Sequence, residues 1–491
     1  MTPVLILILA QAVLGATDNL VHHELQAALP SKPGARTELA LHASREAIYA
    51  VLFAGLAWLE WRGLWALALA ALLAAEIVIT LKDFLVEDAT RRLPPFERVL
   101  HAILAIGYGA ILALLAPVLI GWGALPTGFA LAGHGLISWI MTLAAVGVGA
   151  WSVRNWIAVA SLAHDGAPIS TAAAEGTVLV TGATGFIGRR LTAALIAQQR
   201  RVIVLTRDRL AARAQFGPAP LIVERLDELP SELEVDAIVN LAGASVAGGL
   251  WTPARRRLLK ASRIETTRAL ARFAGRLRRP PRVLVNGSAV GFYGDAGQAP
   301  LEEGEAAGPG FMAELCAAWE AETVRLAALG MRVCVLRFGL VLDWTGGILP
   351  MLALPARLGL AARIGDGRQW APWIHRDDAV RMILAAIDDS AWRGPVNAVA
   401  PELVTQGEMT RRLAAHFRRP QWLAAPARPL RLALGELSDL FLASQRAIPH
   451  AALDLGFVFT RPTLERALAK PEGPLRLASP TRSHEGRPIA A

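Results

Sequence analysis

The stretch Val178–Leu191, VLVTGATGFIGRRL, has a glycine at every third position directly behind an apolar run. A strand, a glycine-rich turn and a helix in this order are typical of the first crossover of a dinucleotide-binding fold. Gly182 allows the tight turn, Gly185 lets the backbone approach a pyrophosphate, and Gly188 lets the helix pack on the strand. The N-terminus of the helix then faces the anion. The stretch therefore predicts a nucleotide site.

Short β-branched runs alternate with helical stretches from this turn onward, in the order TVLVTG, RVIVLTR, APLIVER, DAIVNLAG, RVLVNGSA and RVCVLRFG. This alternation predicts an α/β fold with a doubly wound parallel sheet. The second run ends in Thr206 and Arg207, and the acidic Asp208 comes only after them. An acidic residue at this place binds the ribose hydroxyls of NAD, whereas an arginine accommodates the 2′-phosphate of NADP. Arg207 favours NADP(H) over NAD; the alternative is that Arg207 is only a surface residue.

The first 160 residues are far more apolar than the rest of a chain that is 54% hydrophobic overall. Hydropathy divides them into five segments, each close to the ~20 residues that a membrane-spanning helix needs. The segments are Pro3–Leu25, Leu39–Leu59, Leu64–Lys82, Val99–Trp122 and Gly128–Trp151. The sequence thus predicts an all-α bundle of about five transmembrane helices ahead of the α/β half.

Charges in the loops predict the orientation of this bundle. Basic residues follow the first, third and fifth segments, namely Lys32, Arg36, Lys82, Arg91, Arg92, Arg98 and Arg154. The second loop has only Arg62. Because positively charged loops remain in the cytoplasm, the N-terminus is expected outside and everything after Trp151 inside. We therefore expect a multi-pass protein of a bacterial-type inner (plasma) membrane with its α/β domain in the cytoplasm.

The net charge of +9 does not indicate a nucleic-acid partner. The arginines are scattered beside acidic residues and form no basic stripe interleaved with aromatic residues. The two cysteines, Cys316 and Cys334, do not form a metal-type pair and fit a reducing compartment. The sequence does not determine the oligomeric state.

Ionisable residues lie near the predicted cytoplasmic helix ends, with Asp18 and Glu76 deeper in the bundle. The set at the helix ends is His22, His23, Glu24, His42, Glu46, Asp83, Glu87, Asp88, Glu97 and His101. Two pairs, His42/Glu46 and Glu97/His101, have the i,i+4 spacing that puts both side chains on one helix face.

Three interpretations of these residues stay open. They are solvated or paired with Arg45, Lys82 and Arg98 in the headgroup region; they hold a metal; or they form a quinone, proton or lipid-headgroup site. Their spacing is not the Glu-x-x-His of carboxylate-bridged di-metal bundles. No metal ligand is therefore assigned from the sequence.

Several ordered motifs of the second half resemble the extended short-chain dehydrogenase/reductase superfamily: TGATGFIG, NLAG at Asn240–Gly243, SAVGFYGD at Ser288–Asp295 and WIHRDD at Trp373–Asp378. The order of LAGASVAGGLWTPARRRLLKASRIETTRAL, GFMAELCAAWEAE, RFGLVLDWTGG and LASQRAIPHAALDLGFVFTRPTLERAL is similar to its atypical, sugar-nucleotide-epimerase-like branch, the NAD-dependent epimerase/dehydratases. The resemblance covers about Thr177 to Leu468 and not the membrane half.

This resemblance implies a Rossmann core and a smaller C-terminal substrate lobe, with part of the core interleaved. The expected domains are a transmembrane domain at 1–160, a linker at 161–176, an NADP-binding core at 177–338, the lobe at 339–470 and a disordered tail at 471–491. By position in the motifs, the cofactor-binding residues are Gly182, Thr184, Gly185, Phe186, Ile187, Gly188, Arg207, Asn240, Leu241, Ala242, Gly243 and Ser288.

The chain departs from the superfamily at the catalytic centre. The superfamily uses a Ser, a Tyr as general acid/base, and a Lys four residues after the Tyr that lowers its pKa. Here Phe311 stands in the Tyr place and Leu315 in the Lys place, and no lysine lies between Lys260 and Lys470. A phenyl ring cannot exchange a proton, and a leucine binds nothing ionic.

Four residues are candidates to replace the missing pair: Ser288, Tyr293, Glu314 and His375. Each except Ser288 has a structural alternative. Tyr293 would only stack on the substrate, Glu314 would form a salt bridge with an arginine, and His375, with Asp377 or Asp378 beside it, would cap a helix.

Three functions follow from these observations. The first is a membrane-anchored NADP(H)-dependent oxidoreductase or epimerase-like enzyme for a small-molecule or lipid-linked substrate. The second is a non-catalytic nucleotide-binding redox sensor or scaffold coupled to the bundle. The third, a metal-dependent membrane oxidase supplied by the soluble domain, is disfavoured because no flavin or iron–sulfur motif converts a hydride into single electrons.

Overall fold

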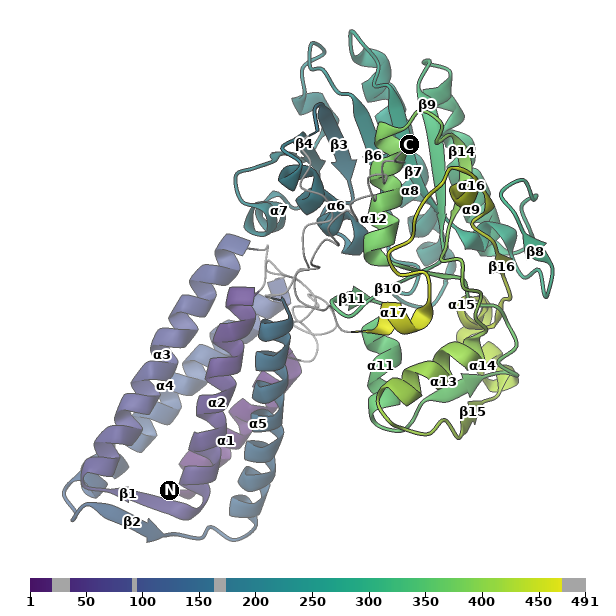
Figure 1. Cartoon of the computed structure of the whole chain (residues 1–491). Coiled ribbons are helices and arrows are strands. Elements are labelled where there is room, and N and C mark those ends of the chain that lie inside the picture. The colour runs from purple at the N-terminus through teal and green to yellow at the C-terminus, as the bar shows by residue number, and fades with distance from the viewer. Residues whose placement is uncertain (20–35, 91–94, 163–173, 470–491) are drawn as a thin grey trace, which may run out of the picture.

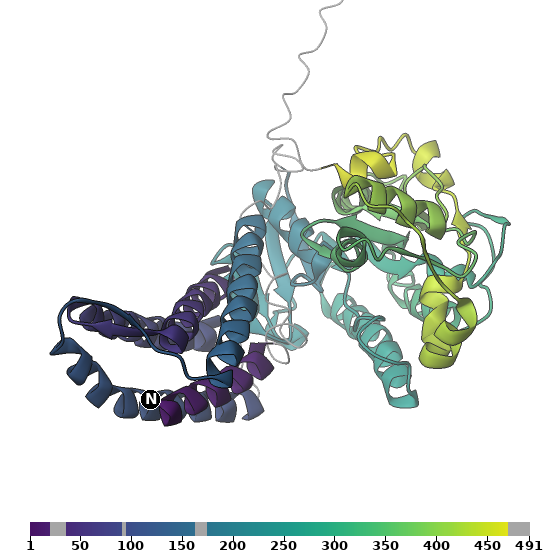
Figure 2. The ribbon, with the colours of Figure 1, turned by 90° about the horizontal axis from the view of Figure 1, so that it is seen from below.

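The structure of the chain is a computed structural model that describes residues 1–19, 36–90, 95–162 and 174–469. Helices α1 to α5, between residues 2 and 162, form a bundle, and the elements from β3 to α17, between residues 177 and 468, form an α/β part (Figure 1). Seen from below, the bundle lies to one side of the C-terminal lobe, which is coloured green to yellow (Figure 2).

Within the described residues, five helices and a two-stranded antiparallel sheet build the bundle. The helices are α1 (Thr2–Asp18), α2 (Arg36–Trp58), α3 (Leu64–Thr90), α4 (Pro95–Gly123) and α5 (Leu136–Leu162), and the strands are β1 (Leu59–Arg62) and β2 (Gly128–Leu131). By length and composition, α2 to α5 can each cross a membrane, and α1 is a shorter apolar helix of 17 residues.

The fifth apolar segment does not begin where the sequence predicted. Gly128 to Leu131 form β2, which pairs antiparallel with β1, and the helix starts only at Leu136. Gly63 at the end of β1 has φ +59°, and a side chain there would meet the Thr127 backbone at 2.6 Å. The glycine therefore lets the turn after β1 approach the turn before β2, which closes this end of the bundle.

Small polar side chains join α2 and α5 along their length. The Ser152 hydroxyl donates to the Ala43 carbonyl at 2.7 Å, and the Ser138 hydroxyl donates to the Ala57 carbonyl at 2.6 Å. Hydroxyls that bond to a neighbouring backbone let two apolar helices approach closely, as is common between membrane helices.

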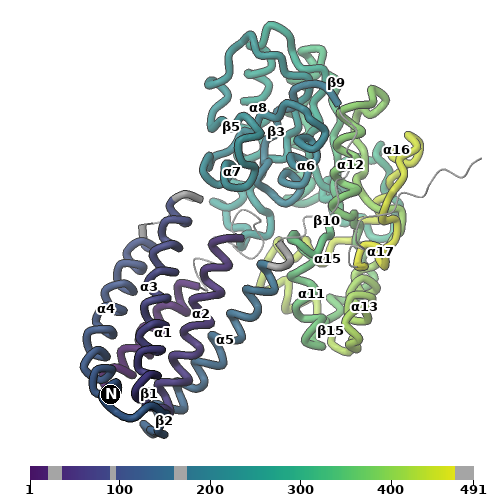
Figure 3. The backbone as a smooth tube through the Cα atoms, turned by 60° about the vertical axis from the view of Figure 1, so that its left-hand side comes forward, coloured from purple at the N-terminus to yellow at the C-terminus, as the bar shows by residue number. Residues whose placement is uncertain are grey.

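The two ends of the bundle differ in their surroundings. The two-stranded sheet of β1 and β2 closes one end, and the other end, where α1, α3 and α5 finish, faces the α/β part (Figures 1 and 3). There α3 lies against α7 (Arg209–Phe216) of the α/β part.

A seven-stranded sheet forms the centre of the α/β part, with strand order β14-β9-β7-β6-β3-β4-β5 and every neighbouring pair parallel. Its strands are β3 (Thr177–Thr181), β4 (Arg201–Leu205), β5 (Leu221–Val223), β6 (Ala237–Asn240), β7 (Val283–Ala289), β9 (Arg332–Phe338) and β14 (Gly394–Ala398). The first six are the six runs predicted from the sequence, and β14 was not predicted. The doubly wound parallel sheet is confirmed.

Helices cover both faces of this sheet, so its strands are apolar on both sides. Val178 and Val180 of β3 pack in one core cluster with α6 and α12, whereas Leu179 packs in another with α8 and α10. The helices of this part are α6 (Phe186–Ala197), α7, α8 (Pro253–Arg276), α9 (Phe311–Glu322), α10 (Val324–Ala327) and α12 (Arg376–Asp388).

The C-terminal lobe has most of its short strands and helices below the sheet, whereas its helix α16 (His450–Asp454) lies beside β14 (Figure 1). Its strands are β10 (Leu340–Asp343), β11 (Gly346–Gly347), β12 (Ala362–Ile364), β13 (Trp373–His375), β15 (Leu423–Ala425) and β16 (Arg446–Ala447), the last pairing with β8 (Pro300–Leu301). Its helices are α11 (Leu349–Arg357), α13 (Gln406–His416), α14 (Ala427–Leu434), α15 (Asp439–Leu442), α16 (His450–Asp454) and α17 (Leu464–Leu468).

The core does not end at residue 338. The chain enters the lobe after β9 and returns with α12 and β14, which complete one edge of the central sheet. Of the predicted linker, residues 163–173 lie outside the described residues, as does the predicted tail at 471–491.

Candidate cofactor and catalytic site

The glycine turn after β3 is shaped by close backbone contacts. Gly182 has φ +67°, and a Cβ there would lie 2.6 Å from the Leu241 carbonyl oxygen. A Cβ on Gly188 would lie only 2.1 Å from the Gly182 carbonyl oxygen. Gly182 is thus required for the turn and Gly188 for the packing of α6 on it, as the sequence predicted.

The N-terminus of α6 is open. Gly185 is its N-cap residue and provides no side-chain hydrogen bond to the helix. Thr184 and Gly185 are exposed, and Phe186 and Ile187 are partly buried. Backbone N–H groups at such an end attract an anion, and the absence of side chains on Gly182 and Gly185 leaves room for one to approach. These residues fit the diphosphate of a dinucleotide.

Phe186 connects this turn to the C-terminal lobe. Its ring lies under the guanidinium of Arg376, at 5.4 Å from the ring centre, and against Gly347 of β11, where a Cβ would approach it to 2.5 Å. Arg376 in turn donates to Thr345 at 2.8 Å. The lobe is therefore attached at the base of the predicted cofactor site.

The end of β4 presents one basic and one acidic residue, and only the basic one is free of local contacts. Arg207 is exposed and makes no hydrogen bond or ion pair with any described residue. The Asp208 carboxylate accepts from the Ala211 N–H at 2.9 Å and caps α7. This arrangement suits a 2′-phosphate better than a ribose hydroxyl.

In the NLAG segment after β6, the amide side chain of the asparagine is used in buried hydrogen bonds. Asn240 is fully buried; its amide donates to Thr267 and Asn286, and its oxygen accepts from Thr181 at 2.7 Å. Leu241 and Ala242 lie over Gly182, and Gly243 is exposed. Asn240 therefore holds β3, β6, β7 and α8 together behind the site.

Ser288 and Tyr293 belong to one buried polar network. The Ser288 hydroxyl donates to Glu320 at 2.6 Å, and Arg337 binds both oxygens of Glu320, at 3.1 and 2.9 Å. Arg337 also donates to the Tyr293 hydroxyl at 2.9 Å, and that hydroxyl donates to Asn397 at 2.7 Å. Sequence reasoning missed Glu320, Arg337 and Asn397, although the first two stand in the quoted motifs GFMAELCAAWEAE and RVCVLRFG.

Tyr293 lies in the interior. Its side chain is 3% exposed, and burial raises its pKa. Because the ring is buried and its hydroxyl bonds to Arg337 and Asn397, Tyr293 is not placed to stack on a substrate. Its hydroxyl instead fixes the position of Arg337.

The places of the missing Tyr and Lys are apolar. Phe311 and Leu315 of α9 are buried with Trp251 and Leu259 in one cluster. Glu314, by contrast, projects outward with its side chain 65% exposed, 3.5 Å from the Lys260 ammonium. Glu314 does not join the Ser288 network, and its partner is a lysine and not an arginine.

His375 caps the N-terminus of α12, which is the structural role that the sequence offered as the alternative to catalysis. Its Nδ1 accepts from the Asp377 N–H at 3.2 Å at the start of α12. The Asp377 carboxylate pairs with Arg190, and the Asp378 carboxylate accepts from Thr460 and Arg461, so neither carboxylate orients the ring. Burial lowers the pKa of His375 and favours the neutral imidazole that this cap requires.

Comparisons with known proteins agree with this geometry. The sequence model of the NAD dependent epimerase/dehydratase family matches residues 178–398, and a domain of unknown function, DUF1731, matches residues 425–470. Both matches lie in the α/β part and leave out the helical bundle.

Relatives match over nearly their whole length. Epimerase family protein YfhF of Bacillus subtilis is 36% identical over 60% of this chain and 97% of its own. The chloroplastic SDR39U1 homolog of Arabidopsis thaliana is 35% identical over 60% of this chain and 85% of its own. The human epimerase family protein SDR39U1, solved with NADPH, is 32% identical over 59% of this chain and 97% of its own, with a TM-score of 0.54.

The sheet order, the glycine turn and the lobe define a Rossmann-type protein of the short-chain dehydrogenase/reductase class. The chain belongs to the NAD dependent epimerase/dehydratase family, in its SDR39U1-like branch.

Proposed function

We propose that the α/β part binds NADP(H). The observation that carries the proposal is the uncapped N-terminus of α6 over Gly182 and Gly185, with Arg207 exposed at the end of the next strand. The human relative solved with NADPH supports the choice of cofactor. Gly182 to Gly188 would hold the diphosphate, Arg207 the 2′-phosphate, and Leu241 to Gly243 the adenosine side.

We further propose that α1 to α5 anchor the chain in a bacterial-type inner membrane, with the α/β part in the cytoplasm. Four helices are long and apolar enough to cross a membrane. The half of the bundle that faces the α/β part contains basic residues, among them Arg36, Lys82, Arg98 and Arg154. At the opposite end, Arg62 of β1 is paired with Glu60. This asymmetry agrees with the cytoplasmic location of positive charge.

The proposed activity is that of an oxidoreductase or epimerase for a small-molecule or lipid-linked substrate, which the lobe at 339–470 would bind. The bound cofactor would supply or accept a hydride. Phe311 and Leu315 cannot transfer a proton. In this proposal, Ser288 and the Glu320 carboxylate, which accepts the hydrogen bond of the Ser288 hydroxyl, transfer the proton instead. Arg337 and Tyr293 position Glu320.

Arg207→Ala tests the cofactor preference. Loss of the guanidinium is expected to weaken NADPH binding about tenfold, the equivalent of roughly 1.4 kcal/mol, and to leave NADH binding unchanged. Calorimetry on the detergent-purified chain measures both. Arg201→Ala is the matched control, because Arg201 is exposed at the opposite end of β4. Equal NADPH and NADH affinities in the unmodified chain would contradict the proposal.

Ser288→Ala and Glu320→Gln test the chemistry. Each is expected to lower NADPH oxidation with a panel of carbonyl compounds by about a hundredfold or more, as for loss of a general acid/base group. NADPH affinity is expected to stay within a factor of about two. Glu265→Gln, at an exposed residue of α8, is the control.

A non-catalytic redox sensor or scaffold is the second candidate. The apolar environment of Phe311 and Leu315 and the contact of α3 with α7 favour it. It predicts NADPH binding without turnover of any carbonyl compound, so the same assay distinguishes the two functions.

A further inference from the structure

A cluster of histidines and carboxylates lies at the end of the bundle that faces the α/β part. Two sets of side chains each bring their ligand atoms within 4.8 Å of one another: Glu38, His42 and Glu87 form the first set, and Asp18, Glu97 and His101 form the second. The first set is fully buried, and in the second set His101 alone is partly buried.

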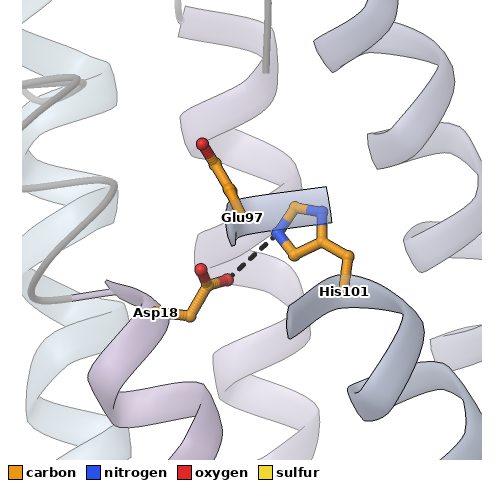
Figure 4. Close-up of side chains that lie close together, drawn as sticks. All are labelled: Asp18, Glu97 and His101. Carbon is orange, nitrogen blue, oxygen red and sulfur yellow. Dashed lines mark hydrogen bonds and ion pairs between the residues drawn. The ribbon is translucent and has the colours of Figure 1, made fainter. Parts of the chain in front are cut away.

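Four helices supply these residues, and two of them use the same spacing. α2 provides Glu38 and His42, and α4 provides Glu97 and His101, so each contributes a Glu-x-x-x-His pair on one face. Asp18 comes from the end of α1 and Glu87 from α3. Figure 4 shows Asp18 and His101 facing each other, with Glu97 one turn along α4 from His101.

Glu87 and His101 link the two sets. One oxygen of Glu87 lies 3.8 Å from His42 Nε2, and its other oxygen lies 3.5 Å from His101 Nδ1. His101 presents its second nitrogen, Nε2, to Asp18 at 3.1 Å. In metal sites, a histidine commonly binds the metal through one ring nitrogen while a carboxylate accepts a hydrogen bond from the other. Glu87 is placed to do this for His101, whose Nε2 faces the second set.

Asp83 places a further carboxylate, a candidate metal ligand, beside His42 of the first set. It is 1% exposed; its Oδ2 lies 3.3 Å from His42 Nε2 and 3.2 Å from Arg45. Its Oδ1 is buried and accepts no hydrogen bond from any described residue. A buried carboxylate oxygen in this state is costly unless something else binds it.

Two further buried or partly buried acidic residues of the bundle, Glu46 and Glu76, have other partners. Glu46 accepts from Asn155 and Asn19, and Glu76 accepts from Tyr49 and Thr80. The His42/Glu46 pair singled out by its spacing is therefore not the pair that converges; Glu38 is the partner of His42. His22, His23 and Glu24 lie outside the described residues.

We propose that this cluster holds two divalent first-row metal ions, one on Glu38, His42 and Glu87 and one on Asp18, Glu97 and His101. Ligands about 2.1 Å from an octahedral ion are about 3 Å apart when adjacent and about 4.2 Å apart when opposite. The distance from His42 Nε2 to Glu87, 3.8 Å, and the distance from His101 Nε2 to Asp18, 3.1 Å, lie within this range. One imidazole with two carboxylates per site favours Mn²⁺ or Fe²⁺ over thiolate-preferring metals.

The test is metal stoichiometry in the full chain. Detergent-purified protein, freed of metal with a chelator, is titrated with Mn²⁺, and free Mn²⁺ is measured by its electron paramagnetic resonance signal. We expect two equivalents bound to the unmodified chain, one to His42→Ala, one to His101→Ala and none to the double variant. Fe²⁺ added under anaerobic conditions is expected to compete with Mn²⁺.

Glu46→Gln is the matched control, since Glu46 lies on α2, is buried and belongs to neither set. It is expected to retain two equivalents. The elution volume in size exclusion and the helical circular dichroism signal identify variants whose bundle has misfolded, and NADPH affinity shows separately whether the α/β part is intact. Glu38→Gln and Glu97→Gln then replace histidine variants that have misfolded. No Mn²⁺ bound by the unmodified chain, or equal binding by all folded variants, would overturn the proposal.

Discussion

At the scale of the residue, the absence of a side chain determines the cofactor site. Gly182 and Gly188 leave no room for a Cβ because backbone lies 2.6 and 2.1 Å from where it would stand. Gly185 differs, since a Cβ there would approach only the Gly182 oxygen, at 3.1 Å. Gly182 and Gly188 are therefore required by the packing of the turn, whereas Gly185 leaves the N-terminus of α6 open to a ligand.

Gly188→Ala tests this distinction. The added methyl must displace α6 from the turn, so we expect NADPH binding to weaken at least about tenfold and the free energy of unfolding to fall by about 1–3 kcal/mol. Calorimetry and thermal unfolding measure the two effects. Gly275→Ala in α8, where a Cβ would meet only Leu329 methyls at 3.8 Å, is expected to be neutral or slightly stabilising. Equal behaviour of the two variants would refute the packing role of Gly188.

At the scale of the element, the helix α12 depends on a histidine cap. Burial lowers the pKa of His375, so the unfolded chain binds the proton more tightly than the folded one. The contribution to stability is therefore complete above the unfolded imidazole pKa of about 6.5 and is lost as the pH falls below it. His375→Asn keeps an acceptor for the cap and does not titrate.

The expected result is a thermal midpoint that falls less between pH 7 and pH 5 in His375→Asn than in the unmodified chain. His375→Ala, which removes the cap, is expected to cost about 1 kcal/mol at pH 7. Tryptophan fluorescence follows the unfolding. Identical pH dependence in the unmodified chain and the Asn variant would show that His375 is not the titrating group.

Sequence patterns predicted the strands and helices better than they predicted which side chains contact one another. Runs rich in Val and Ile identified six strands, but β14, GPVNA, has a single β-branched residue and a proline, and its place at the sheet edge comes from tertiary packing. Helical spacing could not choose between Glu38 and Glu46, because both are four residues from His42 and lie on its face. Likewise the pair Glu320 and Arg337 joins residues that are distant in sequence, which no local pattern reveals.

At the scale of the whole molecule, the bundle orientation is testable with single cysteines. Cys316 and Cys334 are buried, and burial raises their pKa values to about 11 and about 12, so neither reacts readily with maleimides. Leu125→Cys, at the end of the bundle closed by β1 and β2, is expected to be labelled by a membrane-impermeant maleimide in intact cells. Glu265→Cys, on α8, is expected to be labelled only after permeabilisation. The reverse pattern would invert the proposed topology.

The helix α3 reaches from the carboxylates Asp83 and Glu87 to α7, whose N-cap Asp208 directly follows Arg207. The contact between α3 and α7 thus lies between the two proposed binding sites. Thermodynamic reciprocity then constrains any communication between them: the factor by which Mn²⁺ alters the dissociation constant of NADPH must equal the factor by which NADPH alters that of Mn²⁺. Titrating each ligand with and without the other measures the coupling free energy between the two sites.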